Sequence, residues 1–70
     1  MKISARNMLK GIVKEISEGA VNDEIVIELP NGLVITSVIT KSSVKNLGLK
    51  KGEEAYAVIK ASNVMIAVDD

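Results

Sequence analysis

A chain of 70 residues that contains neither cysteine nor histidine has few ways to stabilise a fold. A domain of this size buries only about 60% of the surface that its unfolded chain exposes, so its core is thin. Small domains usually compensate with disulfides, a bound metal or association. Without Cys and His, disulfides, thiolate ligands and imidazole ligands are excluded. We therefore expect one domain, residues 1–70, that is stabilised by self-association.

The composition narrows the choice of partners. Hydrophobic residues make up 47% of the chain, yet there is one Tyr and no Phe or Trp. The net charge is zero, so the basic surface that binds a phosphate backbone is missing, as are aromatic platforms for stacking bases. No apolar run approaches the ~18 residues of a membrane span, and no signal peptide is visible. We expect a cytoplasmic protein without nucleic-acid or membrane partners.

The first half of the chain predicts three strands. Gly11–Ile16 is the first, and its mixed pattern with a leading glycine indicates a twist, a bulge or a close backbone approach. Glu24–Leu29 alternates with period two and therefore predicts a half-buried strand. Pro30–Gly32 has the residues of a hairpin turn, and Leu33–Ile39 is expected to pair back.

The second half predicts a short helix followed by two more strands. Ser42 or Ser43 is placed to cap the helix, and Gly48 is placed to end it. Glu54–Lys60 and the apolar run Val64–Val68 complete the set. The tally is an all-β fold with one short helix, in the order of a five-stranded OB-type barrel. The segment Lys2–Leu9 is compatible with a strand that is exchanged between subunits.

Catalytic constellations are missing from the sequence. Serine and threonine have no histidine to activate them, no Cys or His cluster can bind zinc, and no Gly-rich phosphate loop is present. The carboxylate pairs Glu53–Glu54, Asp23–Glu24 and Asp69–Asp70 lie in turns or at the end, where carboxylates are normally solvated. We expect no catalytic residue, no metal site and no enzyme activity.

Two short polar segments interrupt the apolar sequence near its ends. Ser4–Asn7 and Lys60–Asn63 each contain a cation, a hydroxyl, a small alanine and an asparagine. An oxyanion needs such donors, and hydrogen bonds to an ionised partner are about twice as strong as neutral ones. Taken alone, the composition of the two segments favours ordinary polar loops with surface charges.

Ordered motifs give a more specific indication. Ser4-Ala5-Arg6-Asn7-Met8-Leu9-Lys10-Gly11 resembles the S-A-R-N-x-x-x-G signature of the molybdate-binding Mop domain. Three further stretches resemble the same domain over nearly the whole chain: 19–24 (GAVNDE), 39–49 (ITKS with LGL) and 58–64 (VIKASNV). A free-standing domain of this length is similar to the molbindins.

The resemblance implies an OB-type barrel that assembles as a homohexamer, a trimer of dimers. It implies storage or homeostasis of molybdate or tungstate inside the cell, with the ion held between subunits by hydrogen bonds and without a cofactor. The family's ligand-contacting positions correspond to Ser4, Ala5, Arg6, Thr40, Lys60, Ala61 and Ser62. A second site class near a symmetry axis corresponds to Gly19, Ala20, Val21 and Asn22.

Two alternatives stay open from the sequence. An OB-type nucleic-acid module would shift DNA or RNA in a gel at low salt, although zero net charge and the lone Tyr56 argue against it. A purely structural oligomerisation module would have a melting temperature that ignores molybdate.

Overall fold

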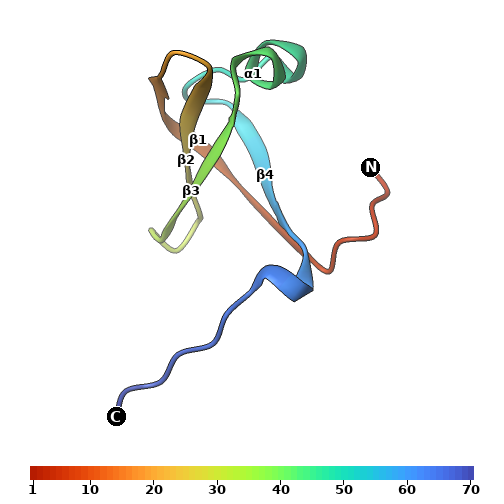
Figure 1. Cartoon of the computed structure of the whole chain (residues 1–70), viewed down its shortest axis with the longest axis vertical. Coiled ribbons are helices and arrows are strands. Elements are labelled where there is room, and N and C mark those ends of the chain that lie inside the picture. The colour runs from red at the N-terminus through yellow and green to blue at the C-terminus, as the bar shows by residue number, and fades with distance from the viewer.

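The computed structural model describes residues 1–70 and consists of one curled sheet with a short helix at one end (Figure 1). The elements in chain order are β1 (Asn7–Glu18), β2 (Asn22–Glu28), β3 (Val34–Thr40), α1 (Lys41–Leu47), β4 (Glu54–Ile59) and the 3₁₀ turn η1 (Ala61–Asn63). The strands pair antiparallel in the order β3-β2-β1-β4. The predicted mostly-β fold with one short helix is confirmed. No helix has the length and apolarity needed to cross a membrane.

Strand β1 is the centre of the sheet because it pairs with two partners in succession. Its first half runs beside β4 and its second half beside β2. The register shifts between Val13 and Glu15, which confirms the predicted irregularity. At Gly11, a Cβ atom would lie 2.5 Å from the Glu28 carbonyl oxygen, so a larger residue would push the two strands apart. The predicted range Gly11–Ile16 was too short, because the pairing to β4 extends the strand back to Asn7.

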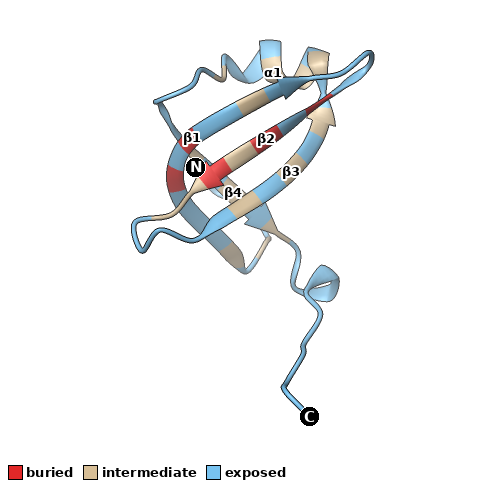
Figure 2. Ribbon diagram, turned by 90° about the vertical axis from the view of Figure 1, so that its left-hand side faces the viewer, coloured by how far each residue is buried: buried red, intermediate tan, exposed pale blue.

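The core is as thin as the length predicts. Val13, Ile25 and Ile27 are its only buried large side chains, and they lie on β1 and β2 (Figure 2). The alternation read in 24–29 is confirmed, since Ile25 and Ile27 are buried while Glu24 is exposed.

Helix α1 occupies the predicted place but has a different cap. Thr40 ends β3 in an extended conformation, and its Oγ1 accepts a hydrogen bond of 3.1 Å from the Ser43 amide. Capping by Ser42 or Ser43 was therefore wrong, because the helix starts at Lys41, directly after the strand. Gly48 ends the helix with φ 64°, as predicted.

The C-terminal segment corrects the five-stranded barrel. The run Val64–Val68 forms no strand, and it extends away from the sheet (Figure 1). Met65, Ile66 and Val68 are 92%, 87% and 87% exposed. The turn η1 directs this segment away from its own sheet, so the single chain contains four strands and not five.

The N-terminal segment forms no strand before Asn7 within the single chain, so the expected exchange between subunits stays a prediction. Residues 1–6 form no strand, and β1 begins at Asn7, paired with β4 of the same chain. The single chain therefore brings its two ends together.

Candidate oxyanion-binding site

The two polar segments lie side by side at one end of the sheet. In the β1–β4 ladder Asn7 is opposite Ile59, so the residues before β1 meet those after β4, beside η1 (Figure 1). They line a hollow of about 600 Å³, which we call the Lys60 hollow. Its lining residues are Ile3, Ser4, Ala5, Arg6, Val58, Lys60, Ala61, Ser62 and Asn63. Six of the seven residues assigned to the main site are thus brought together within one chain.

Backbone donors in the Lys60 hollow are free. The amides of Ala5 and Arg6 precede the first strand, and those of Ala61 and Ser62 lie in η1. None of these four amides donates a hydrogen bond within the chain, whereas the next two amides, those of Asn63 and Val64, do. Ala5 is half-buried and the other three residues are exposed, so an external acceptor can reach these amides. Four unpaired amides in two adjoining segments therefore form a surface suited to an external acceptor.

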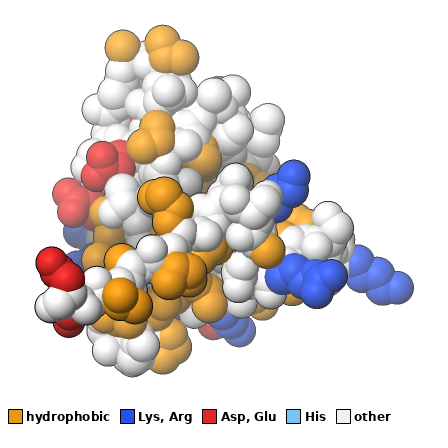
Figure 3. All heavy atoms as spheres, turned by 60° about the horizontal axis from the view of Figure 1, so that its bottom comes forward, with side chains coloured by type: hydrophobic (Ala, Val, Ile, Leu, Met, Phe, Trp, Pro, Cys, Tyr) orange, Lys and Arg blue, Asp and Glu red, His pale blue; other side chains and the backbone are white.

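The charges around the Lys60 hollow have one sign. Arg6 and Lys60 line it, and neither has a carboxylate within 4.0 Å. No aspartate or glutamate belongs to the lining. On the face drawn in Figure 3, basic side chains gather mainly on one side and acidic ones mainly on the other, with apolar side chains between them. The hollow thus offers donors and positive charge, and an anion is the ligand that fits this set.

Asn7 holds the two halves of the hollow together, a role that sequence reasoning did not assign. Its Nδ2 donates a hydrogen bond of 3.2 Å to the Ile59 carbonyl oxygen, directly before Lys60. The side chain is thereby used within the fold and braces the Lys60 segment against the Arg6 segment. Its place in the S-A-R-N motif was the only signal in the sequence.

Thr40 is the one main-site residue that the single chain does not bring to the hollow. It pairs with Asn22 across the β2–β3 ladder, and β3 is the edge strand farthest in the sheet order from β4. Its Oγ1 caps α1 and also contacts the hydroxyls of Ser42 and Ser43 at 3.1 and 2.8 Å. The structure instead places Thr40 beside the second predicted set, Gly19–Asn22, which forms the turn between β1 and β2.

The start of β2, directly after the turn between β1 and β2, contains the chain's buried charge. Asp23 is 4% exposed, and its Oδ1 accepts hydrogen bonds from Lys41 Nζ at 2.9 Å and from the Gly19 amide at 3.2 Å. The bond from Lys41 holds the pKa of the Asp23 carboxyl below its usual range, against the opposing effect of burial. Bonds to Asp23 and then Glu18 raise the pKa of Lys41.

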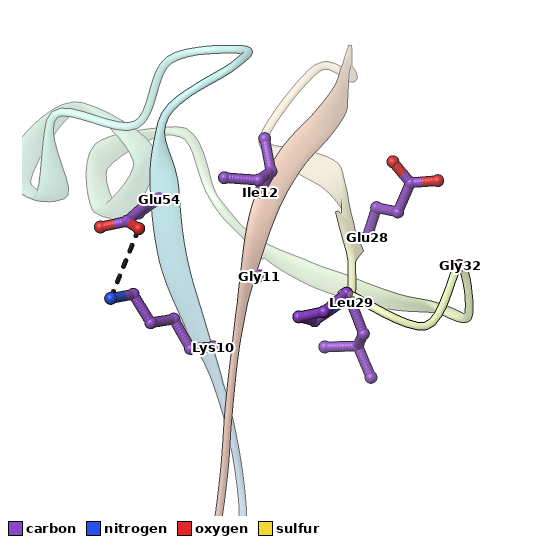
Figure 4. A pocket seen from close by; sticks show the side chains of 8 residues that line it. Lys10, Gly11, Ile12, Glu28, Leu29, Gly32 and Glu54 are labelled. Atoms are coloured by element: carbon purple, nitrogen blue, oxygen red, sulfur yellow. Dashed lines mark ion pairs between the residues drawn. The ribbon is translucent and has the colours of Figure 1, made fainter.

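Another hollow is unsuited to an anion. Lys10, Gly11, Ile12, Glu28, Leu29, Pro30, Gly32 and Glu54 line it (Figure 4). Its only cation, Lys10, is paired with Glu54 at 3.4 Å, which leaves the Glu28 carboxylate in the lining. Glu28 is in turn paired with Lys14 at 3.9 Å, so this hollow has no unpaired cation to offer a dianion.

Comparison with known proteins agrees with this geometry. The TOBE domain matches residues 3–66. A probable molybdenum-pterin-binding protein of Haemophilus influenzae is 49% identical over 69 residues, 99% of this chain and 100% of the relative. Molybdenum-pterin-binding protein 1 of Clostridium pasteurianum is 50% identical over 66 residues, 94% of this chain and 97% of the relative.

Solved structures show the same fold. MopII from Clostridium pasteurianum superposes with a TM-score of 0.90 at 48% identity, covering 96% of this chain and 100% of its own. The cytoplasmic molybdate-binding protein ModG, with molybdate bound, superposes with a TM-score of 0.89 at 55% identity, covering 93% of this chain and 46% of its own. A molybdate-binding protein from Sporomusa ovata gives a TM-score of 0.91 at 38% identity, with 97% and 100% covered.

The fold is a curled β-sheet in which the segments before β1 and after β4 form a donor-rich hollow. Residues 3–66 match the TOBE domain, so the chain belongs to the TOBE domain family. Within that family its relatives are the Mop proteins, and the Mop-domain assignment made from the sequence is confirmed.

Proposed function

We propose that this chain binds molybdate or tungstate in the Lys60 hollow. The observation that carries the proposal is the set of four unpaired amides, those of Ala5, Arg6, Ala61 and Ser62, beside two unpaired cations. Molybdate is a tetrahedral dianion with four acceptor oxygens and no donor at neutral pH. A lining of donors without a carboxylate complements it, and binding through hydrogen bonds needs neither a cofactor nor a metal ligand.

We propose that the two basic side chains have different roles. Lys60 supplies a compact charge with three donors, whereas the planar fork of Arg6 is suited to two oxygens of one ion. The hydroxyls of Ser4 and Ser62 add donors at the same place. Because no bond in this set is covalent, the ion is bound and released unchanged, without catalysis.

The site is completed by other copies of the chain in this proposal. The Lys60 hollow of a single chain is large for one small ion, and Thr40 lies elsewhere in the fold. An exposed apolar segment, Val64–Val68, follows the site directly and has no partner within its own sheet. A homohexamer built as a trimer of dimers would cover this segment, and a second copy would supply Thr40. Exchange of the N-terminal segment between copies remains part of this proposal, because residues 1–6 form no strand within their own chain.

Binding between copies couples ion uptake to assembly, because a ligand that binds only the assembled form stabilises it by mass action. Such a protein suits storage and homeostasis of the oxyanion inside the cell, in keeping with the cytoplasmic molybdate-binding protein ModG.

Calorimetric titration with molybdate, tungstate and sulfate tests the proposal. We expect saturable uptake of molybdate and tungstate at micromolar concentration and weaker uptake of the smaller sulfate dianion. Absence of heat with all three ions, in a protein of confirmed fold, would refute it. A melting temperature that does not rise with molybdate would instead support a purely structural module.

A further inference from the structure

The turn between β1 and β2 has free donors of its own. Neither the amide of Ala20 nor that of Val21 donates a hydrogen bond within the chain, and Val21 is 71% exposed. These two residues belong to the second set that the Mop resemblance singled out. Both donors depend on the shape of a three-residue turn, so whatever fixes that turn controls the donor geometry.

Four hydrogen bonds fix the turn from one side. Asp23 Oδ1 accepts from the Gly19 amide at 3.2 Å, which closes the turn on itself. Lys41 Nζ donates to the same Oδ1 at 2.9 Å and to Glu18 Oε1 at 3.1 Å. The Lys41 amide donates to the Val21 carbonyl oxygen at 3.0 Å, so the start of α1 is tied to the turn through both its backbone and its side chain.

The turn between β1 and β2 leaves no room for a side chain at its first residue. A Cβ atom at Gly19 would lie 2.4 Å from the Asn22 carbonyl oxygen, so the turn is closed tightly across its base. Asp23 is the only buried charged residue of the chain. A buried carboxylate requires compensation, and here its partners are all within the turn and the first residue of α1.

We propose that Asp23, together with Lys41, is a positioning pair for a second oxyanion site at the Ala20 and Val21 amides, an inference that rests on the proposed binding of molybdate by this chain. Neither side chain is a ligand in this proposal. Lys41 is occupied by two carboxylates, and Asp23 would repel a dianion that approached it. The pair acts through the turn, by holding the two amides where one ion can accept from both.

A variant that removes the charge of Asp23 distinguishes a positioning role from a direct electrostatic effect on the ion. Asp23→Asn removes one negative charge but keeps an acceptor for the Gly19 amide. If the carboxylate influenced the ion only through its charge, this variant would bind the second ion as tightly as the wild type or more tightly. If the carboxylate positions the turn through Lys41, the variant binds the second ion more weakly.

The experiment is a molybdate titration of the full chain, followed by calorimetry and by native mass spectrometry, which counts ions per assembly. Wild type is expected to fill two classes of site. Asp23→Asn is expected to weaken the second class by about tenfold, the lower end of the effect of losing an outer partner in metal sites, and to leave the first class unchanged. Glu28→Gln is the matched control, because Glu28 makes an exposed ion pair with Lys14 at 3.9 Å.

Two further variants keep the test decisive if Asp23→Asn folds poorly. Lys41→Met, which removes both side-chain bonds to the turn, should lose the second class, and Lys41→Arg should retain it. An unchanged or tighter second class in Asp23→Asn or Lys41→Met would overturn the inference while leaving the main site standing. A wild type that fills only one class of site would overturn the second site itself, and absence of all uptake would refute the proposed function.

Discussion

The two ends of β1 use the same type of side chain in opposite ways. At the start of the strand, Lys60 and Arg6 have no carboxylate partner and stand beside four unpaired amides. At its end, Lys41 is bonded to both Glu18 and Asp23. The difference teaches that the neighbours of a lysine, and not its charge, decide whether it is available to a ligand or holds the fold together.

A third region, the C-terminal segment, is assigned by our proposal to the interface between copies of the chain, and that interface completes the oxyanion site. Ile66 is 87% exposed and belongs to no strand, so Ile66→Asp should leave the fold of the single chain intact. Exposed substitutions usually change the free energy of unfolding by no more than about 0.5 kcal/mol. We expect the variant to lose the oligomer altogether, because an interface tolerates no unpaired charge in its apolar part.

Light scattering coupled to size exclusion measures this effect, with far-UV circular dichroism as the control for folding. Lys51→Ala, in an exposed turn outside both the hollow and the C-terminal segment, is the control and should keep its assembly. An Ile66→Asp protein that elutes with the wild-type mass would show that Val64–Val68 is not an interface.

Removing the free lysine should weaken binding strongly. In Lys60→Ala, the ion loses a charge-assisted hydrogen bond, and such bonds contribute about 1.5–3 kcal/mol, or about tenfold to a hundredfold in affinity. Calorimetry with molybdate measures the loss. Lys51→Ala, in an exposed turn and with no ion pair, is the control and should bind as the wild type does. Equal affinities in the two variants would remove Lys60 from the site.

The pair of Lys41 and Asp23 should affect the pH dependence of stability and not the affinity for molybdate at the main site. The pKa of Asp23 is lowered from 3.8 by Lys41, so its stabilising effect is present above pH 3.8 and is lost as the pH falls through the lower folded value. The pKa of Lys41 is raised from 10.5, so its effect is lost only as the pH rises beyond that value.

Denaturant unfolding of the wild type and Asp23→Asn between pH 3 and 7 checks this sign. The wild type should be the more stable at neutral pH, and the gap should narrow below about pH 3.8 as the carboxylate becomes protonated. A gap of constant size over this range would mean that Asp23 contributes through packing and not through its charge.

The smallest expected effect concerns the brace between the two halves of the hollow. Asn7→Ala removes the hydrogen bond from Nδ2 to the Ile59 carbonyl oxygen, and one neutral hydrogen bond contributes about 0.5–1.5 kcal/mol to stability. Molybdate affinity should fall by a few fold, since the four amides themselves remain. Thermal melts with and without molybdate measure both quantities. A loss as large as that of Lys60→Ala would instead make Asn7 a ligand.

The sequence alone predicted the parts of this structure that local patterns control. Alternation predicted a half-buried strand over 24–29, in which Ile25 and Ile27 are buried, and Gly48 identified the end of the helix. The S-A-R-N and K-A-S-N motifs led to the Lys60 hollow, because a strand start and a strand end meet in an antiparallel pair.

The parts that failed depend on what lies outside a local window. An apolar run such as Val64–Val68 indicates a strand but not the sheet that it joins, and within one chain it joins none. Thr40 was grouped with the main site by its motif; within one chain the β2–β3 register places it beside Asn22, so its part in the main site depends on a second copy and stays a prediction. The role of Lys41 could not be read from spacing, since Glu18 and Asp23 reach it only after three strands have formed.

Hydrogen exchange of individual amides, followed by NMR with and without saturating molybdate, tests the central claim most directly. The account predicts that the ion slows exchange at Ala5, Arg6, Ala61 and Ser62, the four amides without an acceptor in the chain. Amides already paired in the β1–β4 ladder should change little. Molybdate that binds but leaves all four amides exchanging at their free rates would contradict the account.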